Sequence, residues 1–280
     1  MKTTRREFLT AAGISAASLS GVMSGSAFAQ QTASKKGSDR LKLGMASYTF
    51  RNFSMDEAVA MTKRLGLKHI AFKNMHLPYE TPDDKIKSLA AKVKEAGLDL
   101  YGCGVVYMKD EAEVNRAFDY AKAAGMRIII GVPEHNLLEL VNRKVKEYDI
   151  MLGIHNHGPG DEKYPSPQSV YDKVKNLDKR IGLCMDIGHS MRIGLDPSVE
   201  AERFADRLID VHVKDVSAAS KEGSAIEAGR GVIDLPKFFR TLLKIKYTGI
   251  LALEYEKDDK DPLAGSAESI GYFNGILSVI

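Results

Sequence analysis

The chain has 280 residues, of which 44% are hydrophobic and 28% charged, with 24 glycines and 9 prolines. This ordinary composition excludes a collagen-like, coiled-coil or disordered protein, and the length fits one α/β barrel. The first 29 residues carry three basic side chains and one acidic side chain, so the formal charge of the remainder is +1 rather than +3. Such a small charge argues against a nucleic-acid partner.

The N-terminus has the three regions of an export signal in order. The string T-R-R-E-F-L contains paired arginines, a weakly apolar stretch follows, and A-F-A supplies a small-x-small cleavage site. The string resembles a twin-arginine signal, so we expect residues 1–29 to be removed on export to the periplasm. Residues 30–40 form a polar linker, and residues 41–280 form one barrel domain. No run after the leader is long enough for a membrane span.

From position 41 onward, short β-rich runs alternate with amphipathic segments. The predicted strands are Leu41–Ser47, Lys68–Lys73, Leu98–Gly104, Met126–Val132, Ile150–His155, Ile181–Asp186, Leu208–Lys214 and Gly249–Tyr255. Ser54 and Thr81 are expected to cap two helices, and Glu57 completes a capping box with Ser54. Glycines close three predicted helices: Gly66, Gly97 and Gly125.

Eight strand-then-helix units without a break in composition predict a single closed (β/α)8 TIM barrel. The competing architecture is a doubly wound open sheet. Such a sheet usually carries a glycine-rich phosphate loop after its first strand, but this chain has A-S-Y-T-F-R-N-F-S there. The strand count and the missing loop favour the barrel.

Polar residues gather at the C-terminal ends of strands five to eight, where TIM barrels place functional groups. Adjacent parallel strands lie about 5 Å apart. One inward side chain from each of the four strands can therefore surround one ion: His155, Asp186, His212 and Glu254. Two imidazoles and two carboxylates suit Mn²⁺, Zn²⁺, Co²⁺ or Fe²⁺ better than Ca²⁺. The alternative is that the two carboxylates form buried ion pairs with Lys214 or Arg230.

These strand ends resemble those of the xylose isomerase-like barrel superfamily, which includes ketose 3-epimerases, hydroxypyruvate isomerases, inosose dehydratases and apurinic endonucleases. The resemblance covers roughly residues 41–275. The matching motifs are H-N-H-G at 155–158, D-I-G-H at 186–189, H-V-K-D at 212–215, G-R-G-V-I-D at 229–234 and L-E-Y-E at 253–256. It implies that Asp186, His212 and Glu254 are metal ligands.

One departure from the family pattern bears on the reaction. The family typically ends strand five with glutamate, as E-N-H, whereas this chain has His155. In the isomerases and epimerases that glutamate both binds the metal and moves protons. Inosose dehydratase-like members are similar to this chain in having histidines there. The resemblance therefore implies a hydratase or lyase, with a metal-dependent isomerase or epimerase as the alternative.

Three further segments, S-Y-T-F-R, K-N-M-H-L-P and H-N-H-G-P-G, resemble a secreted bacterial branch linked to 3-keto-glycoside breakdown. The resemblance implies a small keto-sugar substrate and the conversion of 2-hydroxy-3-keto-glucal and water into 3-keto-glucose. A bound divalent metal would stabilise the enolate in that reaction. Barrels of this family often pair, so a homodimer is compatible with the resemblance.

The remaining polar residues receive roles in this hypothesis. His157 and Glu256 are the candidate general acid and base, because each lies two residues after a proposed ligand. Lys214 is the third candidate catalytic residue. The candidate substrate-binding residues are Lys73, His76, His189 and Arg230. The lysines and Arg230 can equally serve as partners of nearby carboxylates.

A third reading is a periplasmic sugar-binding module that has lost catalysis. An apurinic endonuclease is rejected, because those enzymes use more metal ligands and a basic surface that attracts phosphate. Bound metal, and its loss when Asp186 or Glu254 is replaced, would count against the binding module.

Overall fold

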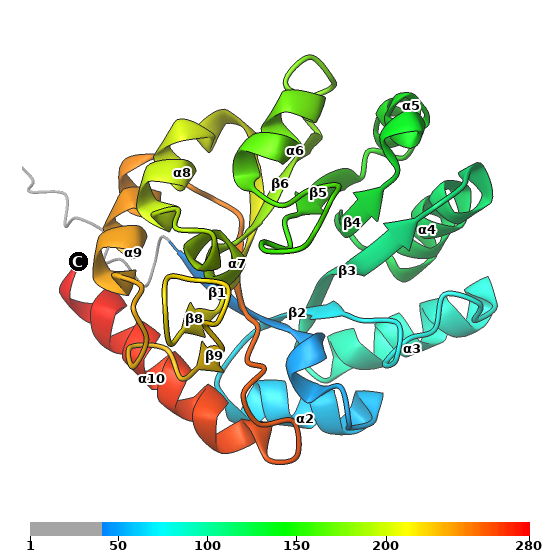
Figure 1. Ribbon diagram of the computed structural model, residues 1–280. Helices are drawn as coiled ribbons and strands as arrows, with labels where there is room; N and C mark the ends of the chain where they lie inside the picture. The colour runs from blue at the N-terminus through cyan, green and yellow to red at the C-terminus, as the bar shows by residue number, and fades with distance from the viewer. Residues whose placement is uncertain (1–40) are drawn as a thin grey trace, which may run out of the picture. The chain divides into compact units, whose positions relative to one another are not determined.

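A computed structural model describes residues 41–280, and these residues form a closed barrel of eight parallel strands (Figure 1). Around the barrel the strands are β1 (Lys42–Ala46), β10 (Ile250–Leu253), β7 (Leu208–Val213), β6 (Ile181–Asp186), β5 (Met151–His155), β4 (Ile128–Pro133), β3 (Asp99–Met108) and β2 (His69–Phe72). The predicted TIM barrel is confirmed. The predicted export signal and linker lie outside the described residues.

The helices form a ring outside the strands (Figure 1). They are α2 (Met55–Arg64), α3 (Asp83–Glu95), α4 (Glu111–Ala124), α5 (Leu138–Tyr148), α6 (Pro167–Val174), α7 (Ile187–Arg192), α8 (Pro197–Arg203), α9 (Leu235–Lys244) and α10 (Pro262–Val279). Three short 3₁₀ turns accompany them, at Ser47–Phe50, His135–Leu137 and Ala205–Arg207. The apolar faces of the α-helices pack on the barrel. In α9, for example, the side chains of Phe238 and Phe239 are fully buried.

The helix ends follow local sequence signals in most cases. Ser54 caps α2, and its side chain and that of Glu57 form the expected capping box. The predicted cap at Thr81 is wrong: α3 begins at Asp83, Pro82 occupies the capping position, and no side chain caps the helix. Asp83 and Asp84 in the first turn stabilise its positive end instead. The three predicted glycine caps all adopt positive φ, with values of 75°, 87° and 68°.

Two features extend the predicted topology. Strand β3 continues past the predicted end at Gly104 to Met108, so Tyr107 belongs to the strand. After β7, the two-residue strands β8 (Asp215–Val216) and β9 (Ala225–Ile226) form an antiparallel hairpin outside the barrel. The hairpin lies beside α7, and both elements follow the C-terminal ends of barrel strands (Figure 1).

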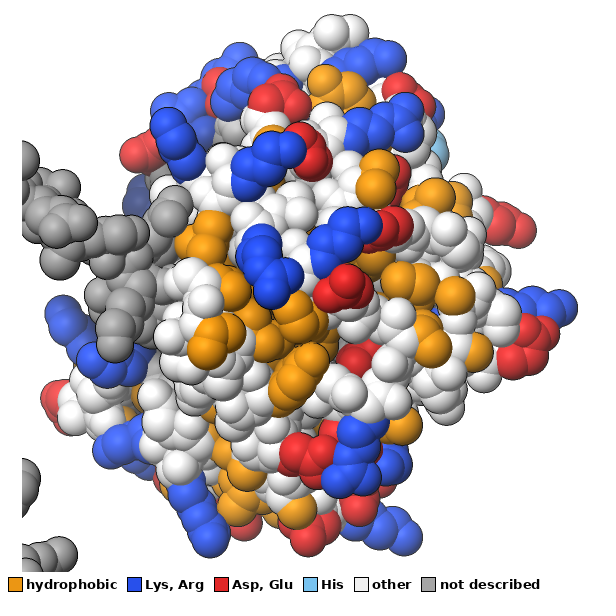
Figure 2. Space-filling view, turned by 90° about the vertical axis from the view of Figure 1, so that its left-hand side faces the viewer, with side chains coloured by type: hydrophobic (Ala, Val, Ile, Leu, Met, Phe, Trp, Pro, Cys, Tyr) orange, Lys and Arg blue, Asp and Glu red, His pale blue; other side chains and the backbone are white. Residues whose placement is uncertain are grey.

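Side chains of both charge signs are interspersed on the face that carries α9 and its neighbouring helices (Figure 2). Hydrophobic side chains gather near the middle of this face. Within residues 41–280, no helix is both long and apolar enough to cross a membrane.

Candidate metal centre

Four buried side chains meet where β5, β6, β7 and β10 end. His155 and Asp186 are the last residues of β5 and β6, His212 lies in β7, and Glu254 follows β10. The strand register brings them together. Asp186 of β6 is paired with His212 of β7, and His212 is paired in turn with Ala252 of β10, two residues before Glu254. Each of the four side chains is at most 7% exposed. The predicted convergence is therefore present.

One ligand atom from each of these residues lies within 4.8 Å of the other three. The Nε2 atom of His155 is 3.2 Å from Nδ1 of His212 and 3.6 Å from Oδ2 of Asp186. The same Nδ1 atom is 3.5 Å from Oε1 of Glu254. Two ring nitrogens and two carboxylate oxygens thus face one point, as ligands of a metal ion do.

The protonation states of these groups suit a cation. Burial lowers the pKa of His155 to about 3, so its imidazole is neutral at physiological pH. Burial also raises the pKa of Asp186, but the positive charges of His189 and Lys214 outweigh burial and hold this pKa well below its usual range. Oδ2 of Asp186 is buried without a hydrogen-bond partner among the described residues. A neutral imidazole and an ionised carboxylate are the forms that bind metals.

Lys214 lies against the carboxylates at 4% exposure. Its Nζ atom is 3.1 Å from Asp186, 2.9 Å from Glu254 and 2.7 Å from Glu256. Burial lowers the pKa of Lys214, but the three carboxylates together raise it well above its usual range. The ion-pair alternative for Lys214 is therefore present in the structure. One ammonium offsets only one of three negative charges, and the charge of −2 that remains equals the deficit a divalent cation neutralises.

A cavity of about 360 Å³ opens above these groups. Its lining residues are Tyr48, Lys73, Val105, Tyr107, His155, His157, His189, Glu254 and Glu256. Its volume lies in the lower part of the range of small-molecule pockets. Nine of the eleven residues predicted for the site line the cavity or, like Asp186, His212 and Lys214, contact those that do.

His157 lies between an acid and a phenol on the cavity wall. Its Nδ1 atom is 3.0 Å from Oδ2 of Asp161, and its Nε2 atom is 3.2 Å from the hydroxyl of Tyr107. Burial lowers the pKa of His157, and Asp161 opposes this shift. The nearby Asp161 carboxylate favours a proton on Nδ1, and in that tautomer Nε2 accepts a hydrogen bond from the Tyr107 hydroxyl. Sequence reasoning missed Asp161, because no motif marks a residue four positions after a histidine.

Lys73 contributes a cation to the lining of the same cavity. Its Nζ atom donates a hydrogen bond to the Val105 carbonyl at 2.8 Å and lies 5.8 Å from the ring centres of Tyr48 and Tyr107. Burial lowers the pKa of the Lys73 ammonium. His189 lies at the base of the cavity, where its backbone N–H donates to Oδ1 of Asp186 at 2.8 Å.

Two predicted substrate residues lie elsewhere. His76 is 4% exposed, and its ring nitrogens are engaged by the Ser47 hydroxyl at 2.9 Å and the Phe50 carbonyl at 3.1 Å. It therefore anchors the segment after β1 and does not face the cavity. Arg230 pairs with Glu268 of α10 and lines neither this cavity nor the one beside it. The alternative role of Arg230, as the partner of a carboxylate, is the one present in the structure.

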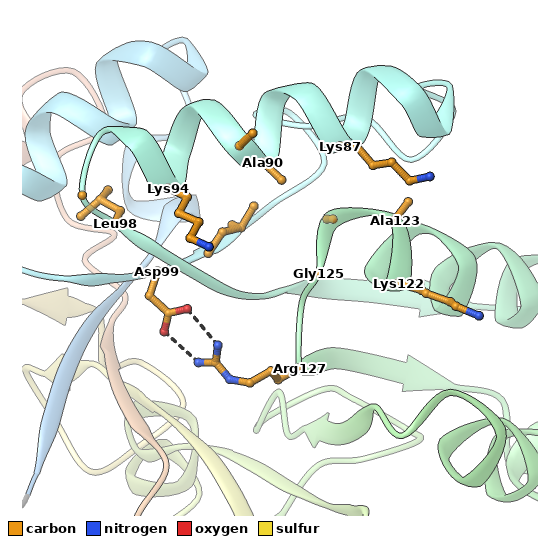
Figure 3. A pocket seen from close by; sticks show the side chains of 13 residues that line it. Lys87, Ala90, Lys94, Leu98, Asp99, Lys122, Ala123, Gly125 and Arg127 are labelled. Carbon is orange, nitrogen blue, oxygen red and sulfur yellow. Dashed lines mark hydrogen bonds and ion pairs between the residues drawn. The ribbon is translucent and has the colours of Figure 1, made fainter.

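A larger cavity, about 690 Å³, lies between α3 and α4 at the other end of the barrel (Figure 3). Asp99 at the start of β3 accepts two hydrogen bonds from Arg127, at 2.9 and 2.8 Å, on its floor. Alanines and lysines of the two helices form its walls. This is the N-terminal face of the barrel, where TIM barrels carry stabilising contacts rather than catalytic groups.

Comparison with known proteins gives a consistent family. The model of the family described as xylose isomerase-like TIM barrel matches residues 54–276. The rhizopine catabolism protein MocC of Rhizobium meliloti is 33% identical over 141 residues, which is 44% of this chain and 41% of that protein. The inosose dehydratase of Geobacillus kaustophilus is 31% identical over 93 residues, or 28% of this chain and 30% of that enzyme. The matches thus span less than half of these relatives.

Solved structures extend the likeness to the whole barrel. The structure of 3-keto-D-glucoside 4-epimerase from E. coli superposes with a TM-score of 0.69 at 14% identity. The alignment covers 84% of this chain and 99% of that one. At this identity the similarity concerns the fold.

Proposed function

This chain belongs to the xylose isomerase-like TIM barrel family, and from that premise we propose that it is a metal-dependent hydratase or lyase of 3-keto-sugars. The specific reaction is the addition of water to 2-hydroxy-3-keto-glucal, giving 3-keto-glucose, and its reversal. The name of one relative, inosose dehydratase, supports a reaction that moves water. The observation that carries the proposal is the buried cluster of two imidazoles and three carboxylates with a single ammonium.

His155, Asp186, His212 and Glu254 would hold the metal. Mn²⁺, Zn²⁺ and Co²⁺ suit this mixed nitrogen and oxygen set. When bound, the metal would supply Lewis-acid stabilisation of the negative charge that develops on the sugar oxygens. Lys214 keeps part of the excess carboxylate charge neutral and fixes Glu256 through a 2.7 Å hydrogen bond.

In this proposal, His157 transfers the proton to and from C2 of the sugar. The carboxylate of Asp161 lies 3.0 Å from Nδ1 and favours the protonated ring, and Nε2 exchanges the proton with substrate in the cavity. During hydration, a C–H bond forms at C2 with this proton, a C–O bond forms at C1 with water, and the C1–C2 double bond becomes single. Glu256 takes the second proton of the attacking water. Dehydration runs through the same groups in reverse.

The cavity walls explain how a sugar would be held. Lys73 has two donor positions left beside its bond to Val105, and these can bind hydroxyl or ketone oxygens. Tyr48 and Tyr107 line the same cavity and offer flat apolar faces to the C–H groups of a sugar ring. His189 contributes a ring nitrogen to the cavity: its Nε2 atom lies 3.5 Å from Nζ of Lys214.

The test is incubation of purified protein with 2-hydroxy-3-keto-glucal in D₂O, followed by NMR. We expect the vinyl signal to disappear, 3-keto-glucose to appear, and deuterium to enter C2 faster than in an enzyme-free control. Metal-free protein and Asp186→Asn should both be inactive, whereas the exposed Asp172→Asn variant should match wild type. With 3-keto-glucose as the substrate, deuterium exchange at C2 with formation of the C2 epimer, and no conversion of the glucal, would replace the hydratase with the epimerase.

We also propose that the protein works in the periplasm, on the basis of the twin-arginine pattern in its first 29 residues. Fractionation of cells that express the full chain tests this proposal. The mature protein should appear in the periplasm of a wild-type strain and stay inside a strain that lacks twin-arginine transport. Equal export by both strains would refute that route.

A further inference from the structure

A second cavity, of about 530 Å³, lies between α7 and the β8–β9 hairpin. Its lining residues are His189, Arg192, Lys214, Val216, Gly223, Ser224, Ala225, Ile226, Glu256 and Lys257. The hairpin and α7 lie side by side next to the barrel (Figure 1). Apart from His189, Lys214 and Glu256, none of its lining residues has a role in the proposed function.

The two cavities meet at shared side chains. His189 and Glu256 line both of them, and Lys214, which lines the second, holds Glu256 at 2.7 Å. The two cavities therefore adjoin at His189 and Glu256. The first cavity has room for one sugar ring beside the carboxylate cluster, and the second is larger.

The lining of the second cavity suits a ring that is rich in hydroxyls. One guanidinium nitrogen of Arg192 donates a hydrogen bond to the Lys221 carbonyl at 3.0 Å. Within residues 41–280, no carboxylate forms an ion pair with Arg192. Its Nε atom is buried without a hydrogen-bond partner among those residues. Ser224 adds a hydroxyl, and Ile226 adds a partly exposed apolar side chain. Hydrogen-bond donors and an apolar side chain in one cavity match the two kinds of surface that a sugar ring presents.

We propose that this second cavity is a subsite for a sugar ring attached at C1 of the 3-keto-sugar, so that the enzyme takes 3-keto-disaccharides as well as the free glucal. The inference rests on the proposed function. The C1–O bond would then lie at the junction, beside Glu256. Elimination removes the C2 proton, breaks the C1–O bond and forms the C1–C2 double bond, and the departing sugar oxygen receives a proton. The products are 2-hydroxy-3-keto-glucal and a free sugar, and no oxidant or reductant is consumed.

The subsite is first tested by binding, without turnover. Calorimetry measures the affinity of wild-type protein for a β-linked pair, cellobiose and methyl β-glucoside. It also measures the affinity for an α-linked pair, trehalose and methyl α-glucoside. We expect one disaccharide to bind at least tenfold more tightly than its methyl glycoside. Arg192→Ala should reduce this ratio at least fivefold, as should Ser224→Trp, which fills the cavity. Arg143→Ala, an exposed arginine on α5, serves as the matched control and should keep the ratio.

Turnover measurements distinguish a failure of the proposed subsite from a failure of the proposed hydratase or lyase function. The ratio of kcat/KM for the 3-keto-disaccharide to that for the methyl 3-keto-glycoside should fall with Arg192→Ala and persist in Arg143→Ala. Equal binding of both sugars to wild type, or an unchanged ratio in both cavity variants, overturns the subsite even if the glucal is hydrated. Tighter disaccharide binding without turnover of any keto-sugar would leave the subsite in place and overturn the proposed function.

Discussion

Replacement of Lys214 by methionine tests the charge balance of the site. The ammonium is 4% exposed and lies within 3.1 Å of three carboxylates. Removal of one partner from a buried ion pair costs about 3–5 kcal/mol, because the remaining charges stay buried without compensation. In the presence of a chelator, we therefore expect Lys214→Met to lose about 3–5 kcal/mol of unfolding free energy. The exposed Lys179→Met variant, which breaks only a surface pair with Asp206, should lose less than about 1 kcal/mol.

The same variant should bind metal more tightly. Two unit charges about 4 Å apart interact with about 4 kcal/mol at an effective dielectric constant of 20. Even one third of that repulsion, relieved when the ammonium is removed, corresponds to about a tenfold gain in affinity for a divalent cation.

Urea unfolding with chelator and with Mn²⁺ or Zn²⁺, combined with calorimetric titration of the metal, measures both effects of Lys214→Met. The metal should thus recover much of the stability lost by the apo variant. Apo Lys214→Met that is as stable as wild type, or that binds metal more weakly, would refute this reasoning.

Four further substitutions have expected outcomes. His157→Gln should lower kcat by about 10²–10⁴-fold and leave the metal content unchanged, as kinetics and elemental analysis would check; Asp161→Asn should shift kcat in the same direction. The hydrogen bond from Lys257 lowers the pKa of Glu227 to about 2. Because this pKa lies below that of the unfolded chain, the ionised carboxylate stabilises the fold at neutral pH. Its contribution is lost as pH falls from about 4.5 toward 2. Glu227→Gln should therefore cost about 1–2 kcal/mol in urea unfolding at pH 7 and much less at pH 2.5; equal losses would contradict the assignment. Ser54→Ala should cost about 0.5–2 kcal/mol in the same assay, and no loss would mean that the capping box is dispensable.

The barrel could be predicted because its signals are local. Each strand is a short apolar run, and the glycine caps mark where three helices end. The meeting of His155, Asp186 and His212 followed from the regular spacing of parallel strands, which leaves little freedom in where strand ends lie.

Features that depend on long-range packing could not be predicted. His76 faces inward because Ser47 and the Phe50 carbonyl, distant in sequence, satisfy its ring nitrogens. Arg230 turns away from the cavity toward Glu268, which lies 38 positions later in the chain. The β8–β9 hairpin has only two residues per strand, too few for an alternating pattern, so the second cavity had no signal in the sequence.

The central claim is that four strand ends hold one divalent metal. Elemental analysis by mass spectrometry after equilibration with Mn²⁺, Zn²⁺ or Co²⁺ and removal of excess ion tests it directly. We expect one metal ion per chain in wild type and in Asp172→Asn, and less than about a tenth of that in Asp186→Asn and Glu254→Gln, each checked for folding by circular dichroism. Folded variants that retain a full equivalent of metal, or a wild type that binds none of the three ions, would contradict it.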